Sequence, residues 1–113
     1  MLLGGCPRSG TTLLASLLER HPGCVVSPES SFKSIFWRTT EGERHSWDRN
    51  RIRRHLEDRF RFRLWGLPTV DDFLPQGPMG IAETILTLVS EYARQRGTPE
   101  VSHWIDHTPG NLR

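Results

Sequence analysis

The residue types best suited to chemistry stand at the start of the chain. An apolar run at 2–5 leads into a polar stretch with a proline, a glycine and three hydroxyl side chains, and a leucine-rich run follows. This order is typical of a buried strand, a tight loop and a helix. The loop amides and the first N–H groups of such a helix can surround a phosphate-like anion. The expected members of this anion-binding loop are Pro7, Arg8, Ser9, Gly10, Thr11, Thr12 and Leu13.

The same loop differs from the nucleotide-binding P-loop. That motif ends in Gly-Lys-Ser/Thr, whereas Gly10 stands where its lysine would be. Arg8 is the cation of this loop, and its guanidinium can donate two parallel hydrogen bonds to one oxyanion. A P-loop nucleotide kinase or other NTPase is therefore an alternative that the missing lysine disfavours. The sequence also has no evident Mg²⁺-binding aspartate after an apolar strand.

Three stretches together resemble sulfotransferases of the bacterial and tyrosylprotein types, which use 3′-phosphoadenylyl sulfate (PAPS). Residues 7–14 resemble the 5′-phosphosulfate loop of that family. Ser-Pro-Glu at 27–29 is similar to the segment that carries a glutamate base in tyrosylprotein-type members. Residues 104–111 resemble the signature Trp-x-Asp-Lys-Thr-Pro-x-Asn of bacterial-type members, with His107 in place of the lysine. The middle of the chain carries hardly any of the resemblance.

The resemblance implies a reaction and roles for three residues. The reaction is transfer of a sulfuryl group from PAPS to a hydroxyl or amine acceptor by in-line displacement, without a metal. Arg8 would hold the phosphosulfate and offset charge on the bridging oxygen. Glu29 would be the catalytic base. His107 would take the place of the family's lysine, although a histidine is charged only in part near neutrality.

Simpler roles for these residues remain open. Ser27 can cap a helix that starts with Pro28, and Glu29 then lies in its first turn, where a carboxylate suits the helix dipole. His107 can be an ordinary loop residue at a strand end. Asp106 can cap the turn that follows it.

Hydrophobic periodicity predicts an α/β fold, and the resemblance makes it a P-loop-like doubly wound parallel sheet with flanking helices. Too few strand candidates are present for a whole sheet of this kind. We therefore expect residues 1–113 to be the N-terminal part of a single sulfotransferase domain, truncated before the region that binds the 3′-phosphate. The predicted helices are 10–20, a short one through Phe32, 47–64, 69–74 and 80–96, and the predicted strands after the first are 24–26 and 103–105.

Three of these helices have an apolar face that is expected to pack inward. The residues of these faces are Leu13, Leu14, Leu17 and Leu18 in 10–20, Ile52, Leu56 and Phe60 in 47–64, and Ile81, Ile85, Leu88, Val89 and Tyr92 in 80–96. The four tryptophans, Trp37, Trp47, Trp65 and Trp104, are expected in the core or at an interface and not as a stacking platform.

The stretch from Arg49 to Arg63 contains seven arginines with Phe60 and Phe62 interleaved. Such a stretch can bind RNA or DNA phosphates. A solvated helix face, partly balanced by Glu57 and Asp58, is the more common explanation. A third interpretation is a basic wall that attracts an anionic nucleotide or an acidic acceptor. We expect no nucleic-acid partner.

The composition and the apolar runs of the sequence limit the classes of protein to which the chain can belong. The formal net charge is only +2, and Lys33 is the single lysine. Two cysteines, Cys6 and Cys24, are too few for a disulfide framework and lack metal-ligand spacing. No apolar run reaches the ~20 residues that span a bilayer, and no signal peptide is visible. The default expectation is a cytoplasmic location, while the compartment, the acceptor and the oligomeric state stay open.

Overall fold

The computed structural model describes residues 1, 3–5, 10–30, 32, 47–98 and 100–108. Within this part of the chain it is an α/β structure with two short parallel strands and several helices, which confirms the predicted class at that level. The loop residues 7–9 and the predicted helix beyond Phe32 lie outside the described residues. The elements are α1 (Thr11–Leu18), β1 (Cys24–Val26), α3 (Arg49–Asp58), α4 (Phe60–Arg63), α5 (Val70–Phe73), α6 (Ile81–Gln95) and β2 (His103–Ile105).

The sheet places the N-terminal segment beside β2. Strands β1 and β2 pair in parallel, with Val25 opposite Trp104. On the other edge of β2, Leu3 donates its N–H to the carbonyl of Asp106 at 2.7 Å, and Asp106 donates to the carbonyl of Met1 at 2.9 Å. In a parallel pair, the N–H and the carbonyl of one residue form hydrogen bonds with two residues of the neighbouring strand that are two positions apart. The order is therefore β1, β2, N-terminal segment, unlike the two common doubly wound sheets, whose first strand lies beside the second.

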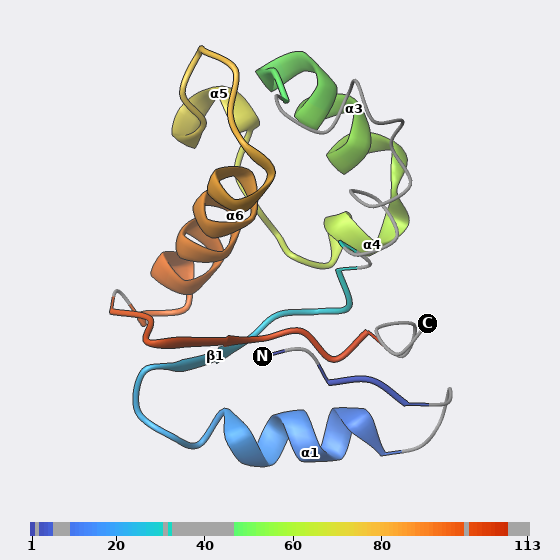
Figure 1. The fold of residues 1–113 in the computed structure, drawn as a ribbon, viewed down its shortest axis with the longest axis vertical. Helices are drawn as coiled ribbons and strands as arrows, with labels where there is room; N and C mark the ends of the chain where they lie inside the picture. The colour runs from blue at the N-terminus through green and yellow to red at the C-terminus, as the bar shows by residue number, and fades with distance from the viewer. Residues whose placement is uncertain (2, 6–9, 31, 33–46, 99, 109–113) are drawn as a thin grey trace.

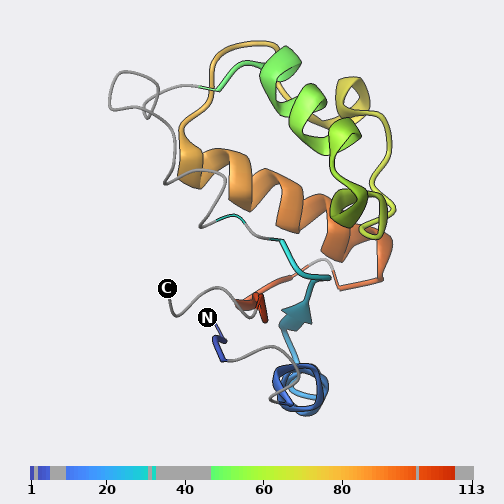
Figure 2. The same ribbon diagram turned by 90° about the vertical axis from the view of Figure 1, so that its right-hand side faces the viewer.

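Helices lie on both sides of this small sheet (Figures 1 and 2). Helix α1 runs along one face, and α3, α4, α5 and α6 form a layer over the other face. The core lies mainly in this second layer. There Phe32 packs against Phe62, Trp65 and Trp104, with ring centroids 5.4–5.7 Å apart. Trp65 in turn contacts Tyr92 of α6 at 5.2 Å, so aromatic rings link the sheet to the helical layer.

The side chains of α1 are much less buried than those of the helical layer on the other face of the sheet. Only Ala15 of this helix is buried, at 1% exposure, whereas Leu13, Leu14 and Leu17 are 68%, 47% and 53% exposed. The sequence predicts these leucines as one apolar stripe, and among the described residues that stripe is largely uncovered. The helix itself is confirmed, two residues shorter at its C-terminal end than predicted.

The prediction of one helix over 47–64 is wrong. The chain leaves the helical conformation at Arg59, with φ −110° and ψ 115°, and resumes it as α4. The break turns the following side chains, so that Phe62 is buried at 5% exposure and Phe60, expected on the apolar face, is 70% exposed. Burial of Phe62 against Phe32 and Trp65 accounts for this change of phase.

Residues 3–5, part of the first strand predicted at 2–5, are not a strand in the structure, whereas the remaining predicted elements within the described residues are confirmed. Strands β1 and β2 have the predicted bounds, and α5 and α6 match within one residue at each end. Helix α6 ends where Gly97 takes a left-handed φ of 78°. Gly97 donates its N–H to Arg94 and Thr98 donates to Ala93, which is the Schellman arrangement. Ile81, Ile85, Leu88, Val89 and Tyr92, the predicted inward residues, all belong to the core or pack against it.

Candidate functional site

Two segments meet at the carboxyl edge of the sheet, one after β1 and one after β2. Each alternates buried anchors with a more accessible residue. After β1, Ser27 and Ser30 are both 1% exposed and flank Glu29, whose side chain is 33% exposed. After β2, Asp106 and Thr108 are 0% and 5% exposed and flank the half-buried His107. We call the anchors, together with Trp104, the strand-end cluster: Ser27, Ser30, Trp104, Asp106 and Thr108.

Asp106 is the centre of this cluster. Ser30 donates its hydroxyl to Oδ2 at 2.5 Å, while Thr108 donates both its hydroxyl, at 2.6 Å, and its backbone N–H, at 3.1 Å, to Oδ1. The backbone N–H of Ser30 donates to the hydroxyl of Thr108 at 3.0 Å. Asp106 therefore caps its own turn, as the sequence allows, and also ties the two segments together. A buried carboxylate with its oxygens satisfied in this way is costly to disturb.

Trp104 adds a link further back. Its indole Nε1 donates to the hydroxyl of Ser27 at 3.0 Å. The hydroxyl of Ser27 thus accepts a hydrogen bond from β2. Residues 28–30 are not helical, so the prediction that Ser27 is the N-cap of a helix starting at Pro28 is wrong. The same indole ring packs on Phe32. The aromatic core and the polar strand ends are therefore one continuous structure.

The side chain of Glu29 contacts α4. Its Oε2 forms an ion pair with Nη1 of Arg61 at 3.0 Å. The buried neighbours Ser27 and Ser30 fix the backbone at Glu29, and Arg61 holds one oxygen of its carboxylate. The carboxylate stays accessible enough to meet a ligand. The structure gives Glu29 no place in a helix, so a helix-start role for this residue is wrong.

His107 lies at the adjoining strand end. Its Nδ1 is buried and has no hydrogen-bond partner among the described residues. A buried ring nitrogen without a partner is uncommon in proteins. The predicted residues Glu29 and His107 thus stand on two segments that the strand-end cluster bonds together, 78 positions apart in the chain.

The predicted anion loop is described only at its helical end. Pro7, Arg8 and Ser9 lie outside the described residues. Gly10 is the N-cap of α1 with a left-handed φ of 84°, and among the described residues no atom outside its chain neighbours lies within 4 Å of where a Cβ would be. Thr12 and Leu13 of the first turn are exposed, and Thr11 is half-buried. The backbone here is open to a ligand, as anion binding at a helix N-terminus requires.

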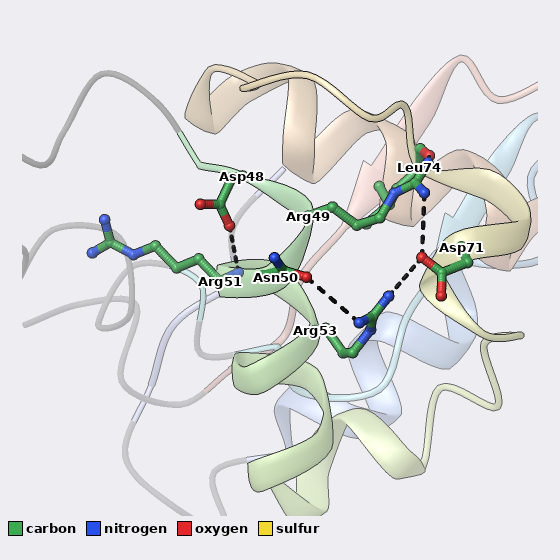
Figure 3. A network of polar contacts seen from close by, with 7 residues as sticks. All are labelled: Asp48, Arg49, Asn50, Arg51, Arg53, Asp71 and Leu74. Carbon is green, nitrogen blue, oxygen red and sulfur yellow. Dashed lines mark hydrogen bonds and ion pairs between the residues drawn. The ribbon is translucent and has the colours of Figure 1, made fainter.

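The arginine-rich stretch does not form one uniform surface. Arg49 and Arg53 share the carboxylate of Asp71 in α5, at 3.2 and 2.5 Å, and Arg49 also donates to the carbonyl of Leu74 (Figure 3). Arg51 extends to the opposite side of α3. With Arg61 bound to Glu29, the arginines of this stretch have several separate tasks.

The described residues contain no group of three or more His, Cys, Asp or Glu side chains that could hold a metal ion. In the same part of the chain no helix has the length and apolarity needed to cross a bilayer. Trp47 and Trp65, predicted as core and not as a stacking platform, are 1% and 2% exposed.

Sequence reasoning missed Ser30, Thr108 and Arg61 as parts of the site. The motif of the second segment does contain Thr108, but nothing local indicates that its hydroxyl reaches Ser30. A possible signal was the pairing of small hydroxyl residues directly after both strands, since the carboxyl ends of neighbouring parallel strands lie together.

Comparison with known proteins agrees with the resemblance seen in the sequence. The family model described as Sulfotransferase family matches residues 1–113. Searches of curated proteins and of solved structures give no significant match. The family match spans the whole chain and includes the loop, the Glu29 segment and the His107 segment. The chain belongs to the Sulfotransferase family.

Proposed function

We propose that this protein transfers a sulfuryl group from PAPS to a hydroxyl or amine acceptor, on a P-loop-like sheet of which the described strands are part. Membership of the family supports sulfuryl transfer in general. The observation that carries the finer proposal is the strand-end cluster, which brings Glu29 and His107 to one edge of the sheet. Ligands of open α/β proteins bind outside the carboxyl ends of the strands.

Arg8 and the first turn of α1 would receive the 5′-phosphosulfate. Among the described residues no side chain caps α1 and none fills the space at Gly10, which fits an oxyanion ligand. Arg8 is the nearest cation in sequence and would offset the negative charge that grows on the bridging oxygen. The remaining donors would come from Ser9, Thr11 and Thr12, with Pro7 and Leu13 completing the loop.

Glu29 would be the base for the acceptor. The acceptor oxygen or nitrogen forms a bond to sulfur and passes its proton to the Glu29 carboxylate, while the bond from sulfur to the bridging oxygen breaks and adenosine 3′,5′-bisphosphate leaves. Arg61 would orient the carboxylate, because it holds one of its oxygens. His107, whose side chain is half-buried at the adjoining strand end, would hydrogen-bond a reacting oxygen where the family has a lysine.

Hydrogen exchange tests the donor site directly. Adenosine 3′,5′-bisphosphate should slow exchange of the backbone amides from Ser9 to Leu13. Arg8→Ala should remove this protection, whereas Arg20→Ala, an exposed arginine just beyond α1, should retain it. Unchanged exchange in the folded protein at saturating nucleotide would refute the proposed donor site.

A further inference from the structure

The side of α3 that faces away from Asp71 has a distinct charge pattern. Asp71 accepts from Arg49 and Arg53, so the arginines on that side of α3 are ion-paired (Figure 3). Arg51 extends in the other direction. A hollow of about 560 Å³ lies there, and we call it the basic hollow. It is lined by Arg51, Arg54, His55, Asp58 and Arg59.

The basic hollow carries an excess of positive charge. Among the described residues that line it, Arg54 and Arg59 bring two positive charges against the one negative charge of Asp58. Arg54 and Arg59 form no ion pair with any described residue and are exposed. Their guanidinium groups remain available to an oxyanion, to which they can donate paired hydrogen bonds.

Two side chains that line the basic hollow pack on the hydrophobic core. The guanidinium carbon of Arg51 lies 4.3 Å from the centroid of the Trp47 ring, and the His55 ring lies 4.7 Å from the same ring. Trp47 is itself buried at 1% exposure and pairs with Met79 through backbone hydrogen bonds. Two of the hollow's side chains therefore rest on a fixed platform, which lowers the entropy that a ligand must overcome.

His55 reports the local potential. Burial and the positive charges of Arg59, Arg51 and Arg54 hold the pKa of His55 below its ordinary 6.5, and Asp58 only partly opposes them. An anion placed among these groups would oppose the same charges. His55 is thus a titratable ring among the charged groups of the hollow, and its pKa can be followed when an anion is added.

We propose that the basic hollow is a second oxyanion site, separate from the donor loop, which holds a sulfate or carboxylate group of the acceptor. Its connection along the chain to Arg61, the ion-pair partner of the candidate base Glu29, favours the acceptor over the donor. Arg59 lines the hollow, and Arg61, which binds Glu29, follows two residues later, so their Cα atoms are at most about 7 Å apart. The proposal of an oxyanion site does not depend on the proposed function, whereas its assignment to the acceptor rests on that function.

Titration of His55 by NMR tests the site in the whole protein. The His55 pKa is measured in chloride, in sulfate and in acetate at equal ionic strength, so that general screening is the same in each. Bound oxyanion should raise the His55 pKa by about half a unit or more relative to chloride. A larger effect of sulfate assigns a tetrahedral dianion, and a larger effect of acetate assigns a carboxylate.

Matched variants locate the effect. Arg54→Gln and Arg59→Gln should each reduce the anion-induced shift at least by half, whereas Arg63→Gln, an exposed arginine of α4 outside the hollow, should leave it intact. Equal His55 pKa values in all three salts, or an undiminished shift in both hollow variants, would overturn the proposal. Because the readout is at His55, its failure is distinct from a failure of nucleotide protection at 9–13.

Discussion

The strand-end cluster and the basic hollow place polar residues in opposite environments. In the cluster, hydroxyl, indole and carboxylate groups from distant parts of the chain are buried and bond to one another. In the hollow, Arg54 and Arg59 are exposed and form no ion pair with a described residue. The buried groups fix geometry at the sheet edge, and the exposed groups supply charge. Disturbing each should therefore have a different consequence.

Asp106→Ala should give the largest loss of stability. It removes the acceptor for two hydroxyls and one backbone N–H in a buried place. We expect the free energy of unfolding to fall by about 3 kcal/mol, the cost of buried groups left without partners. Urea denaturation measures this, and Asp106→Asn, which keeps the shape, should lose less. Asp72→Ala, at an exposed aspartate of α5, should stay within about 0.5 kcal/mol. Similar losses at both aspartates would contradict the central role of Asp106.

Trp104→Phe should have a smaller effect. The phenyl ring can keep the packing on Phe32, but the hydroxyl of Ser27 loses the indole donor. Loss of one hydrogen bond to a buried hydroxyl predicts a decrease of about 1 kcal/mol in the free energy of unfolding. Adding Ser27→Ala should then cost little more, because the partner is already gone. Fully additive losses in this double-mutant cycle would show that the bond contributes nothing.

His55 should have the smallest effect, and one that depends on pH. Its pKa is lower in the folded chain than the ordinary 6.5, so the unfolded chain binds more protons as pH falls below about 6.5. Stability should decrease over that range, by less than about 1 kcal/mol because the ring is partly exposed. His55→Asn should flatten the decrease in denaturation curves recorded at several pH values. An unchanged slope in the variant would assign it to other groups.

Local signals predicted most of the described elements. The apolar run at Cys24–Val26, the repeat of apolar residues through α6 and the stop at Gly97 each act over a few residues, so the sequence displays them. The break at Arg59 has no proline or glycine to mark it. It depends on where Phe62 finds a partner, and Phe32 lies far away in the chain.

The candidate site likewise combines residues that local motifs predict with contacts that depend on distant parts of the chain. Glu29 and His107 could be named from motif resemblance, and the parallel strands before them imply a common edge. The contacts that hold them could not be predicted, since Ser30 meets Asp106 and Glu29 meets Arg61 only after folding. The assignment of Ser27 as an N-cap failed for this reason, because its partner, Trp104, is 77 positions away.

The most direct test of the account is a paired measurement on Glu29→Gln in the complete protein. The glutamine keeps the shape of the side chain but cannot accept the acceptor's proton. PAPS-dependent turnover should fall by about 10²-fold or more, while PAPS affinity changes little. The free energy of unfolding should stay within about 1 kcal/mol, because the ion pair with Arg61 is partly exposed. Glu57→Gln on the surface of α3 is the control and should change neither quantity. Near-normal turnover together with a clear loss of stability would contradict a base at Glu29 and would leave His107 as the next candidate.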